Sequence, residues 1–239
     1  MPKLSFISHY YNHPEMVESQ IAYWETLPDS ILSQTEFILV DDCSEELPVI
    51  KAARLDLKVF RVITDIPWNQ AGARNLGAFN ASGEWVLFFD IDQKFYIEPM
   101  IALMASLHLL NPLTMYYFRI KELVNSLTNT PLQTAPCTFL VNLAKFKWMG
   151  MYDEDFAGHY GYEDLYVPQV WEKHGGDRIL FSDPVYFEDL AFGTENLDRD
   201  LTRNKALAQQ KMATGTKNSP GILRFEWEPV DISLGQGRK

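Results

Sequence analysis

The first half of the chain alternates between short apolar runs and segments whose apolar residues recur at helical spacing. Continuous apolar runs are typical of strands that are buried on both faces, as in a parallel sheet. Two such runs occur, at Phe37–Val40 and Trp85–Phe89, and the apolar-rich segments Leu4–Ser8 and Leu57–Ile63 are further strand candidates. Helices are predicted after Pro14, a residue that suits a first helical turn, and at residues 70–81. This alternation predicts an α/β fold with a largely parallel central sheet.

The second half of the chain has a less regular pattern. It predicts strands at 115–120, 138–141, 178–181 and 185–187, a helix at 163–174 and a polar-faced helix at 195–212. The first of these helices is expected to end at Gly175-Gly176, because glycine commonly follows a helix C-terminus. From residue 213 onward Gly, Ser and Pro are frequent, and we expect the last residues to be loosely held. No repeat or linker divides the sequence, which predicts one domain over residues 1–239.

Composition narrows the classes of partner. The formal net charge is −11 and no run of basic residues offsets it. Nucleic acid is excluded as an expected partner, because its binding depends on Lys and Arg displacing counterions. No apolar stretch approaches the ~20 residues of a transmembrane helix, so we expect a soluble, cytoplasmic protein. Cys43 and Cys137 are far apart in sequence and are expected to be free thiols.

Polar residues follow three of the predicted strands, at His9–Asn12, Asp41-Asp42 and Asp90-Ile91-Asp92. In open α/β sheets, ligands bind outside the carboxyl ends of the strands. Three polar strand ends that face one crevice predict a nucleotide site.

Asp90 and Asp92 lie two residues apart at a strand end, where both carboxylates can reach a divalent cation if the chain turns. Oxygen ligands suit Mg²⁺ or Mn²⁺, which also bind substrate phosphates. Such a cation stabilises the charge of a departing diphosphate. Aspartates also form simple turns after strands. The apolar run Trp85–Phe89 directly before the pair favours the metal site.

Three further residues are candidates for binding a nucleotide. The Asp42 carboxylate could accept a hydrogen bond from a base imide or a ribose hydroxyl, or it could simply end a strand. The ring of Tyr11 could stack on the base or only pack. Arg74 has a planar donor fork that suits a diphosphate, and the alternative is a surface arginine on a closely packed helix.

Glu163 and Asp164 open a predicted helix after a glycine-rich segment. Acidic residues favour helix N-termini because of the helix dipole, so capping explains them. The functional alternative makes Asp164 the general base for an acceptor hydroxyl, with Glu163 holding the acceptor. His9 is a candidate because of its strand-end position, whereas His174 is assigned to the end of the helix.

Several short blocks, taken together and in order, resemble glycosyltransferase family 2 and its GT-A relatives over residues 3–190. These blocks are the first strand with its Tyr-Asn, Val40–Ser44, Ala73–Gly77, Ala81–Glu84, Phe88–Asp92, Trp148–Phe156 and Gly161–Asp164. The resemblance implies a GT-A fold with a Rossmann-like, mostly parallel sheet and an acceptor-side subregion. It divides the domain into a nucleotide-sugar-binding half (1–95), an acceptor-binding half (96–190), and a C-terminal helix and tail (191–239).

The resemblance also implies roles for the donor-side residues. Asp42, together with His9 and Tyr11, would bind the base, and Arg74 would lie near the diphosphate. The donor would be a nucleotide-diphospho-sugar, with UDP favoured and GDP second.

For the reaction centre, the resemblance implies that Asp90 and Asp92 bind Mn²⁺ or Mg²⁺, with Asp92 the closer ligand. Asp164 would be the base of a single in-line displacement that inverts the anomeric carbon. Glu163 and Trp148 would contact the acceptor, a glycan or another molecule with a hydroxyl group.

The sequence departs from the family pattern in two places. Family members often supply a further metal ligand, commonly His, after the Glu-Asp helix, but here the segment is Val185–Leu190. Either Glu188 or Asp189 substitutes for it, or the metal is held more loosely. The Gln-x-x-Arg-Trp motif of processive members is also absent, which predicts transfer of a single sugar.

Three other functions compete with this one. A haloacid-dehalogenase-type phosphatase carries its Asp pair after the first strand, whereas this pair follows the fourth. A sugar nucleotidyltransferase would need a Gly-rich, Arg-containing loop after the first strand, and residues 9–13 have none. The third alternative is a non-catalytic nucleotide-sugar-binding module, against which the presence of both Asp92 and Asp164 argues.

Overall fold

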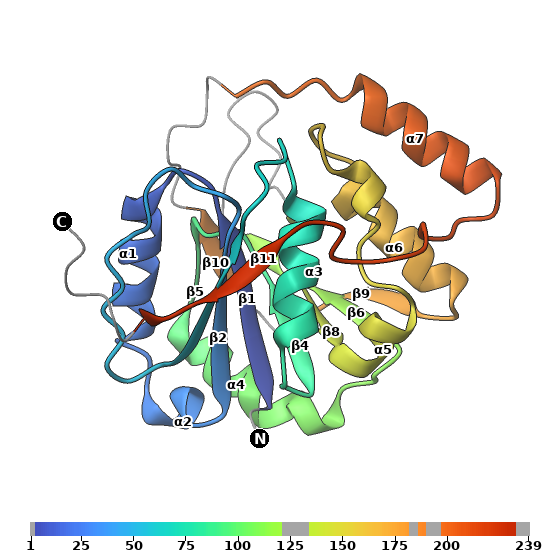
Figure 1. The fold of residues 1–239 in the computed structure, drawn as a ribbon. Helices are drawn as coiled ribbons and strands as arrows, with labels where there is room; N and C mark the ends of the chain where they lie inside the picture. The colour runs from blue at the N-terminus through green and yellow to red at the C-terminus, as the bar shows by residue number, and fades with distance from the viewer. Residues whose placement is uncertain (1–2, 121–133, 182–185, 190–196, 233–239) are drawn as a thin grey trace, which may run out of the picture.

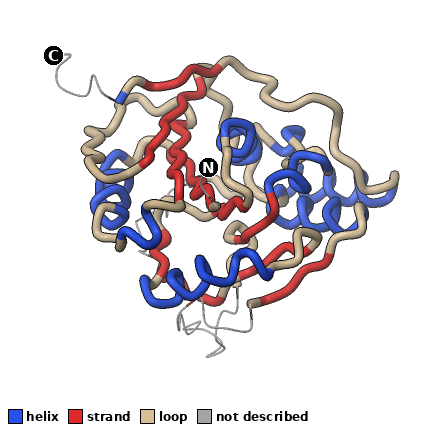
Figure 2. Tube along the Cα trace, turned by 90° about the horizontal axis from the view of Figure 1, so that it is seen from below, coloured by secondary structure: helices blue, strands red, loops and turns tan. Residues whose placement is uncertain are grey.

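The computed structural model describes residues 3–120, 134–181, 186–189 and 197–232. The chain folds into an α/β structure in which helices cover both faces of a central sheet (Figures 1 and 2). The expected fold class is therefore confirmed.

The central sheet has eight strands in the order β11-β3-β2-β1-β4-β8-β6-β9. Its parallel part consists of β3 (Asp56–Val62), β2 (Thr35–Asp41), β1 (Leu4–Tyr10) and β4 (Trp85–Phe88). The other half of the chain extends this sheet through β8 (Phe139–Asn142), β6 (Thr114–Tyr117) and β9 (Asp177–Leu180). The last strand, β11 (Trp227–Val230), runs antiparallel to β3.

A second sheet has three short strands in the order β5-β10-β7. They are β5 (Gln93–Phe95), β10 (Tyr186–Asp189) and β7 (Arg119–Ile120). Asp189 pairs with Gln93 in an antiparallel register. This pairing brings the backbone of β10 beside the residues that directly follow Asp92.

Successive residues of the central strands enter two different cores, because side chains alternate across a strand. Phe6 faces the core beneath α1 (Pro14–Trp24), α2 (Asp29–Leu32) and α4 (Ile97–Ser106). Ile7 faces the opposite core, which α3 (Gln70–Asn80), α5 (Leu143–Trp148) and α6 (Glu163–Lys173) cover. Short 3-10 helices lie at Leu107–Leu109 and Glu154–Phe156. Burial on both faces explains the continuous apolar runs of the central strands.

The C-terminal part of the chain differs from its prediction. The helix predicted at 195–212 is α7 (Thr202–Ala213), and residues 197–201 precede it without helical structure. The sequence pattern also gave no sign of α4, α5 or β11. Strand β11 is short, half-exposed and contains Pro229, so it lacks the apolar run of an interior strand. An edge position next to β3 is where a sheet tolerates proline.

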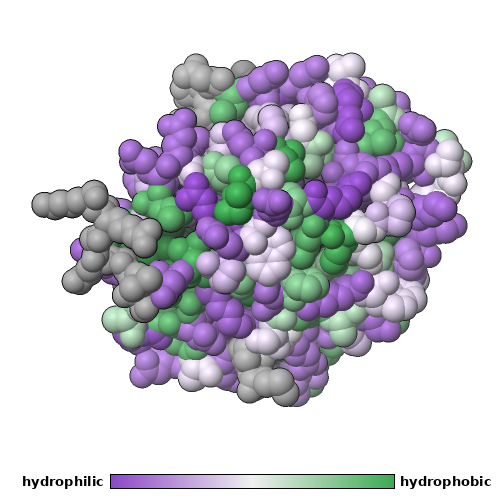
Figure 3. Space-filling view, in the orientation of Figure 1, coloured by the Kyte–Doolittle hydropathy of each residue, from purple (hydrophilic) through white to green (hydrophobic). Residues whose placement is uncertain are grey.

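No helix in the described part of the chain is long and apolar enough to cross a membrane. The face of the molecule in Figure 3 carries mainly hydrophilic residues, with hydrophobic residues scattered between them.

Candidate active site

The predicted polar strand ends meet at one edge of the central sheet. Tyr10 at the end of β1 pairs with Asp41 at the end of β2, and Ile7 pairs with Phe88 at the end of β4. Because these three strands are parallel neighbours, the polar residues that follow them lie along the same edge.

The chain turns directly after β4, as a two-carboxylate site requires. The backbone N–H of Gln93 donates to the carbonyl of Asp90 at 3.0 Å. The Gln93 side chain reinforces this turn, because its Oε1 accepts from the backbone N–H of Asp90 at 3.1 Å. Asp90 and Asp92 therefore lie on one fixed turn between β4 and β5.

Arg74 connects this turn with the start of α6. Its guanidinium is 1% exposed and donates to Oδ1 of Asp90 at 2.6 Å and to Oδ1 of Asp164. The hydroxyl of Tyr152 donates to the same oxygen of Asp164 at 2.8 Å and lies 3.3 Å from a guanidinium nitrogen of Arg74. We call Arg74, Asp90, Tyr152 and Asp164 the Arg74 cluster. It joins two carboxylates that are distant in sequence, Asp90 and Asp164, through the guanidinium of Arg74.

Small residues on α3 allow Arg74 to sit this deep. An added Cβ at Gly77 would lie 2.4 Å from Cγ2 of Ile7, so α3 packs against β1 more closely than any residue with a side chain would allow. The following residue, Asn75, bonds with its side chain to both backbone groups of Tyr152, at 2.9 and 3.0 Å. The helix therefore holds both Arg74 and the tyrosine that contacts Asp164.

Charges in the Arg74 cluster shift the pKa values of its neighbours. Burial opposes ionisation of Asp90, but the charge and hydrogen bond of Arg74 together with the other neighbouring groups outweigh it, and the pKa of Asp90 lies below its ordinary value. Burial, followed by the charge of Arg74, lowers the pKa of His9 to about 4, so His9 is neutral at pH 7. Burial raises the pKa of Asp164, and burial together with the Asp164 charge raises that of Glu163 to about 8. An elevated pKa suits a group that must take up a proton.

The start of α6 is held in an unusual backbone conformation. Gly161 and Tyr162 both have positive φ, 77° and 73°, and Glu163 begins the helix. Positive φ is uncommon for a tyrosine and often marks a functional site. Instead of only capping the helix, the Asp164 carboxylate accepts hydrogen bonds from Arg74 and Tyr152.

The opposite side of the sheet edge carries the predicted base-binding residues. Asp42 is 6% exposed and accepts a hydrogen bond from Nδ2 of Asn69 at 3.0 Å. Burial raises the pKa of Asp42 to about 7, and the charges of Asp41 and Asp65 add to this effect. The side chain of Tyr11 is 45% exposed beside this group.

Buried polar atoms without a hydrogen-bond partner gather near the carboxyl end of β1 and on α3. Nine such atoms occur in the described residues, and five of them are here: Ser8 Oγ, His9 Nδ1, Tyr10 OH, Asn69 Oδ1 and Arg74 Nε. Buried polar groups in proteins are nearly always paired with protein, water or ligand. Their concentration here is what a site for a polar ligand requires.

A cavity of about 650 Å³ lies beside Asp164, between α6, α7 and the β6–β9 edge of the sheet. Its lining combines aromatic, apolar and polar side chains, among them Tyr117, Tyr162, Leu165, Gln169, Arg178 and Met212. Asp164 therefore has the sheet-end polar groups on one side and a cavity on the other.

Comparison with known proteins identifies the family. Residues 22–157 match the model of glycosyl transferase family 2, which is more than half of the chain. The chain belongs to glycosyl transferase family 2.

A curated relative, an uncharacterised glycosyltransferase of Haemophilus influenzae, is 34% identical over 95 residues. That match covers 40% of this chain and 31% of the relative, so the chain spans less than a third of the relative's length.

Solved glycosyltransferase structures share the fold. TarS of S. aureus in complex with UDP-GlcNAc superposes with a TM-score of 0.70 at 18% identity, covering 92% of this chain and 68% of TarS. The mannosyltransferase PcManGT of Pyrobaculum calidifontis, in complex with GDP-Man and Mn²⁺, superposes with a TM-score of 0.59 at 15% identity. That match covers 90% of this chain and 63% of PcManGT. At these identities the likeness shows the fold alone.

A metal held by Asp90 and Asp92 would need a further protein ligand if it followed the pattern that the resemblance implies. No group of three or more His, Cys, Asp or Glu side chains that could hold a metal occurs in the described residues. The side chains of Glu188 and Asp189, the two predicted substitutes, lie outside this description. Their backbone in β10 runs beside Gln93, directly after the Asp90–Asp92 turn.

Trp148 is not brought to the Arg74 cluster. It is 65% exposed at the end of α5, with its ring 5.2 Å from the ring of His174. His174 follows the last turn of α6, whereas Asp164 is in the first turn, about 15 Å away along the helix. The predicted acceptor contact at Trp148 would therefore lie far from the reacting groups.

Two residues that bond to candidate site residues, Tyr152 and Asn69, were not predicted as site residues from the sequence. Tyr152 stands between a glycine-methionine turn and three acidic residues, and Asn69 has the ordinary residue type of a helix start. Neither carries a local signal of function, because the partners of each are distant in sequence.

Proposed function

We propose that this family 2 protein is an inverting, metal-dependent, non-processive glycosyltransferase. It moves one sugar from a nucleotide-diphosphate donor to an acceptor hydroxyl. One observation carries the proposal: the guanidinium of Arg74 bonds at once to Asp90 in the turn after β4 and to Asp164 in the first turn of α6. A donor bound at the sheet edge would thus have its anomeric carbon near Asp164, the carboxylate that receives the acceptor's proton.

The donor is a UDP-sugar in this proposal, with a GDP-sugar second. Asp42 and Tyr11 lie where the strand ends would meet the base, and Tyr10, directly before Tyr11, has a buried hydroxyl without a hydrogen-bond partner. The two structural neighbours bind nucleotide sugars of these two kinds, UDP-GlcNAc and GDP-Man.

Asp90 and Asp92 would hold Mn²⁺ or Mg²⁺. Two carboxylates on a fixed turn fit these cations, which take their remaining ligands from water and substrate phosphates. The bound cation would stabilise the negative charge that develops on the departing diphosphate. In this proposal Asp92 is the closer ligand of the cation.

Asp164 acts as the general base. As the acceptor oxygen forms its bond to the anomeric carbon, the hydroxyl proton passes to Asp164, and the bond to the diphosphate breaks with its electron pair on the leaving oxygen. Attack from the face opposite the diphosphate inverts the anomeric centre. Arg74 and Tyr152 fix the Asp164 carboxylate, and the cavity of about 650 Å³ that Asp164 lines would receive the acceptor. Glu163, directly before Asp164, would hold the acceptor.

The proposal is tested by melting the protein with UDP or GDP, each with and without Mn²⁺, and by following release of the diphosphate from UDP-GlcNAc and GDP-Man. A ligand that binds only the folded state raises the melting temperature. We expect one nucleotide to stabilise the protein in a Mn²⁺-dependent way, and its sugar donor to be cleaved. Stabilisation without any cleavage or transfer would instead support a non-catalytic nucleotide-sugar-binding module.

A further inference from the structure

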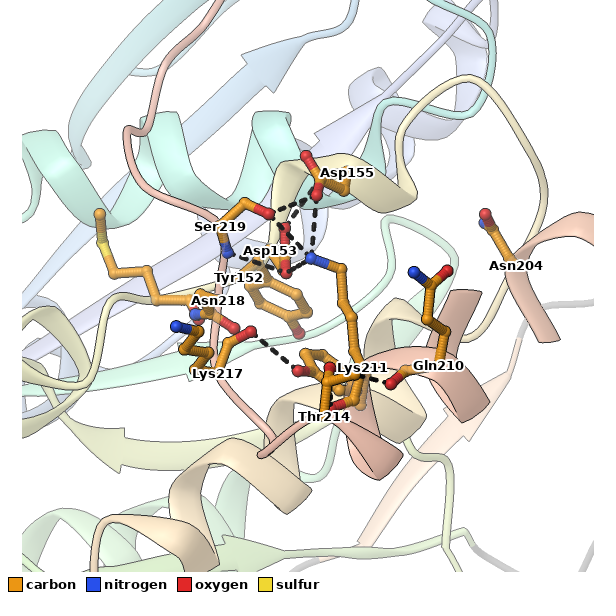
Figure 4. Close-up of polar contacts among 12 residues, drawn as sticks. Tyr152, Asp153, Asp155, Asn204, Gln210, Lys211, Thr214, Lys217, Asn218 and Ser219 are labelled. Atoms are coloured by element: carbon orange, nitrogen blue, oxygen red, sulfur yellow. Dashed lines mark hydrogen bonds and ion pairs between the residues drawn. The ribbon is translucent and has the colours of Figure 1, made fainter. Parts of the chain in front are cut away.

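The C-terminal helix and the chain that follows it lie against the loop at residues 151–161 (Figure 4). The ammonium of Lys211 in α7 lies 2.7 Å from Oδ2 of Asp153 and 2.8 Å from Oδ2 of Asp155. It also donates to Oγ of Ser219 at 2.8 Å. The Lys211 side chain is 13% exposed and that of Asp153 is fully buried, so the pair is largely shielded from solvent.

This ion pair is one residue away from the Arg74 cluster. Asp153 directly follows Tyr152, and the hydroxyl of Tyr152 donates to Asp164 at 2.8 Å. Oδ1 of Asp153 also accepts from the backbone N–H of Asp155, which fixes the turn. A displacement of Asp153 would therefore move the tyrosine that contacts the proposed base.

The same helix also holds the other end of the loop. Asn204 is fully buried, and its Nδ2 lies 2.9 Å from the carbonyl of Phe156, 2.8 Å from that of His159 and 2.7 Å from that of Gly161. Gly161 is three residues before Asp164. Helix α7 thus contacts the loop at two places, near Tyr152 through Lys211 and near Asp164 through Asn204.

We propose that Lys211 and Asn204 are positioning residues that set the geometry of Asp164 from outside the reaction centre. The inference rests on the proposed role of Asp164 as the base. Neither residue has a contact with the Arg74 cluster itself in the described part of the chain, so their effect passes through Asp153 and the loop backbone. An error of about 1 Å in the placement of a reacting group can cost about 100-fold in rate. The contacts that Lys211 and Asn204 make with the loop can therefore affect the rate of transfer.

The test compares Lys211→Met with Lys211→Arg and with the control Lys205→Met. Lys205 is exposed on the same helix. Turnover of UDP-GlcNAc or GDP-Man, whichever the wild type cleaves, is measured with Mn²⁺ well below the melting temperature of each variant. We expect Lys211→Met to lower kcat about 10- to 100-fold while KM for the donor and the nucleotide-induced melting shift stay as in the wild type. Lys211→Arg should restore most of kcat, and Lys205→Met should leave it unchanged.

Equal kcat in Lys211→Met and Lys205→Met would overturn the inference. So would a fall in kcat that comes with an equal loss of nucleotide binding, since that pattern indicates general damage to the fold. Asn204→Ala, matched with the exposed Gln209→Ala, should give the same split between kcat and KM.

Hydrogen exchange decides the inference even if the wild type cleaves no donor, in which case the proposed function fails on its own. We expect Lys211→Met to speed amide exchange at residues 151–162 about tenfold or more, with the amides of β2 unchanged. Unchanged amide exchange in that loop would show that Lys211 does not hold it, and would refute the inference.

Discussion

Asp42 offers a quantitative test of how this site is built. Its carboxyl is 6% exposed, and burial raises its pKa from an ordinary 3.8 to about 7. Between these two values the folded state keeps a proton on Asp42 that the unfolded state releases, so the contribution of Asp42 to stability falls as pH rises through this window. At about 1.4 kcal/mol per pKa unit, the loss is about 4 kcal/mol between pH ~4 and pH ~7.

Asp42→Asn removes this titration and leaves an amide oxygen that can still accept the hydrogen bond from Asn69. The free energy of unfolding, measured in urea across the same pH range, should therefore decline less in the variant than in the wild type by about 4 kcal/mol. The exposed Asp56 provides the matched control, and Asp56→Asn should keep the wild-type pH dependence. Parallel pH curves for wild type and Asp42→Asn would refute the reasoning.

Further predictions concern the other site residues. Asp92→Asn should abolish the Mn²⁺-dependent part of the nucleotide-induced melting shift, and a full shift would argue against a metal at this turn. Asp164→Asn should retain nucleotide binding while transfer falls about 100-fold or more, so transfer at the wild-type rate would exclude it as the base. Arg74→Met should cost about 3–5 kcal/mol in urea unfolding, because it leaves buried carboxylates unpaired, and a cost near zero would contradict the ion pairs. Trp148→Ala, at a side chain 65% exposed, should leave donor cleavage unchanged, and a large loss would return this residue to the site.

The sequence pattern was sufficient to predict the elements with strong local signals. Strands β2 and β4 are buried on both faces, so their apolar runs are unbroken, and the polar ends of β1, β2 and β4 stand out. The aspartates at those ends could be selected because a parallel sheet gathers its carboxyl ends at one edge. The same pattern could not predict β11, since an edge strand with one exposed face lacks this run.

The contacts within the site were beyond local inference. Arg74 was expected near a diphosphate, but its partners in the structure are carboxylates 16 and 90 residues further along the chain. No local pattern links Lys211 with Asp153, because the two residues meet only once α7 has folded back onto the loop. Tertiary packing, rather than residue type or spacing, decides which charged groups meet.

A crystal structure with UDP and Mn²⁺ would test the central claim most directly. The account predicts Mn²⁺ bound by Asp92 and the diphosphate, the uracil beside Asp42, and Asp164 facing the place where the sugar would be attached. A nucleotide or metal bound away from the Asp90–Gln93 turn, with Asp164 facing neither, would contradict it.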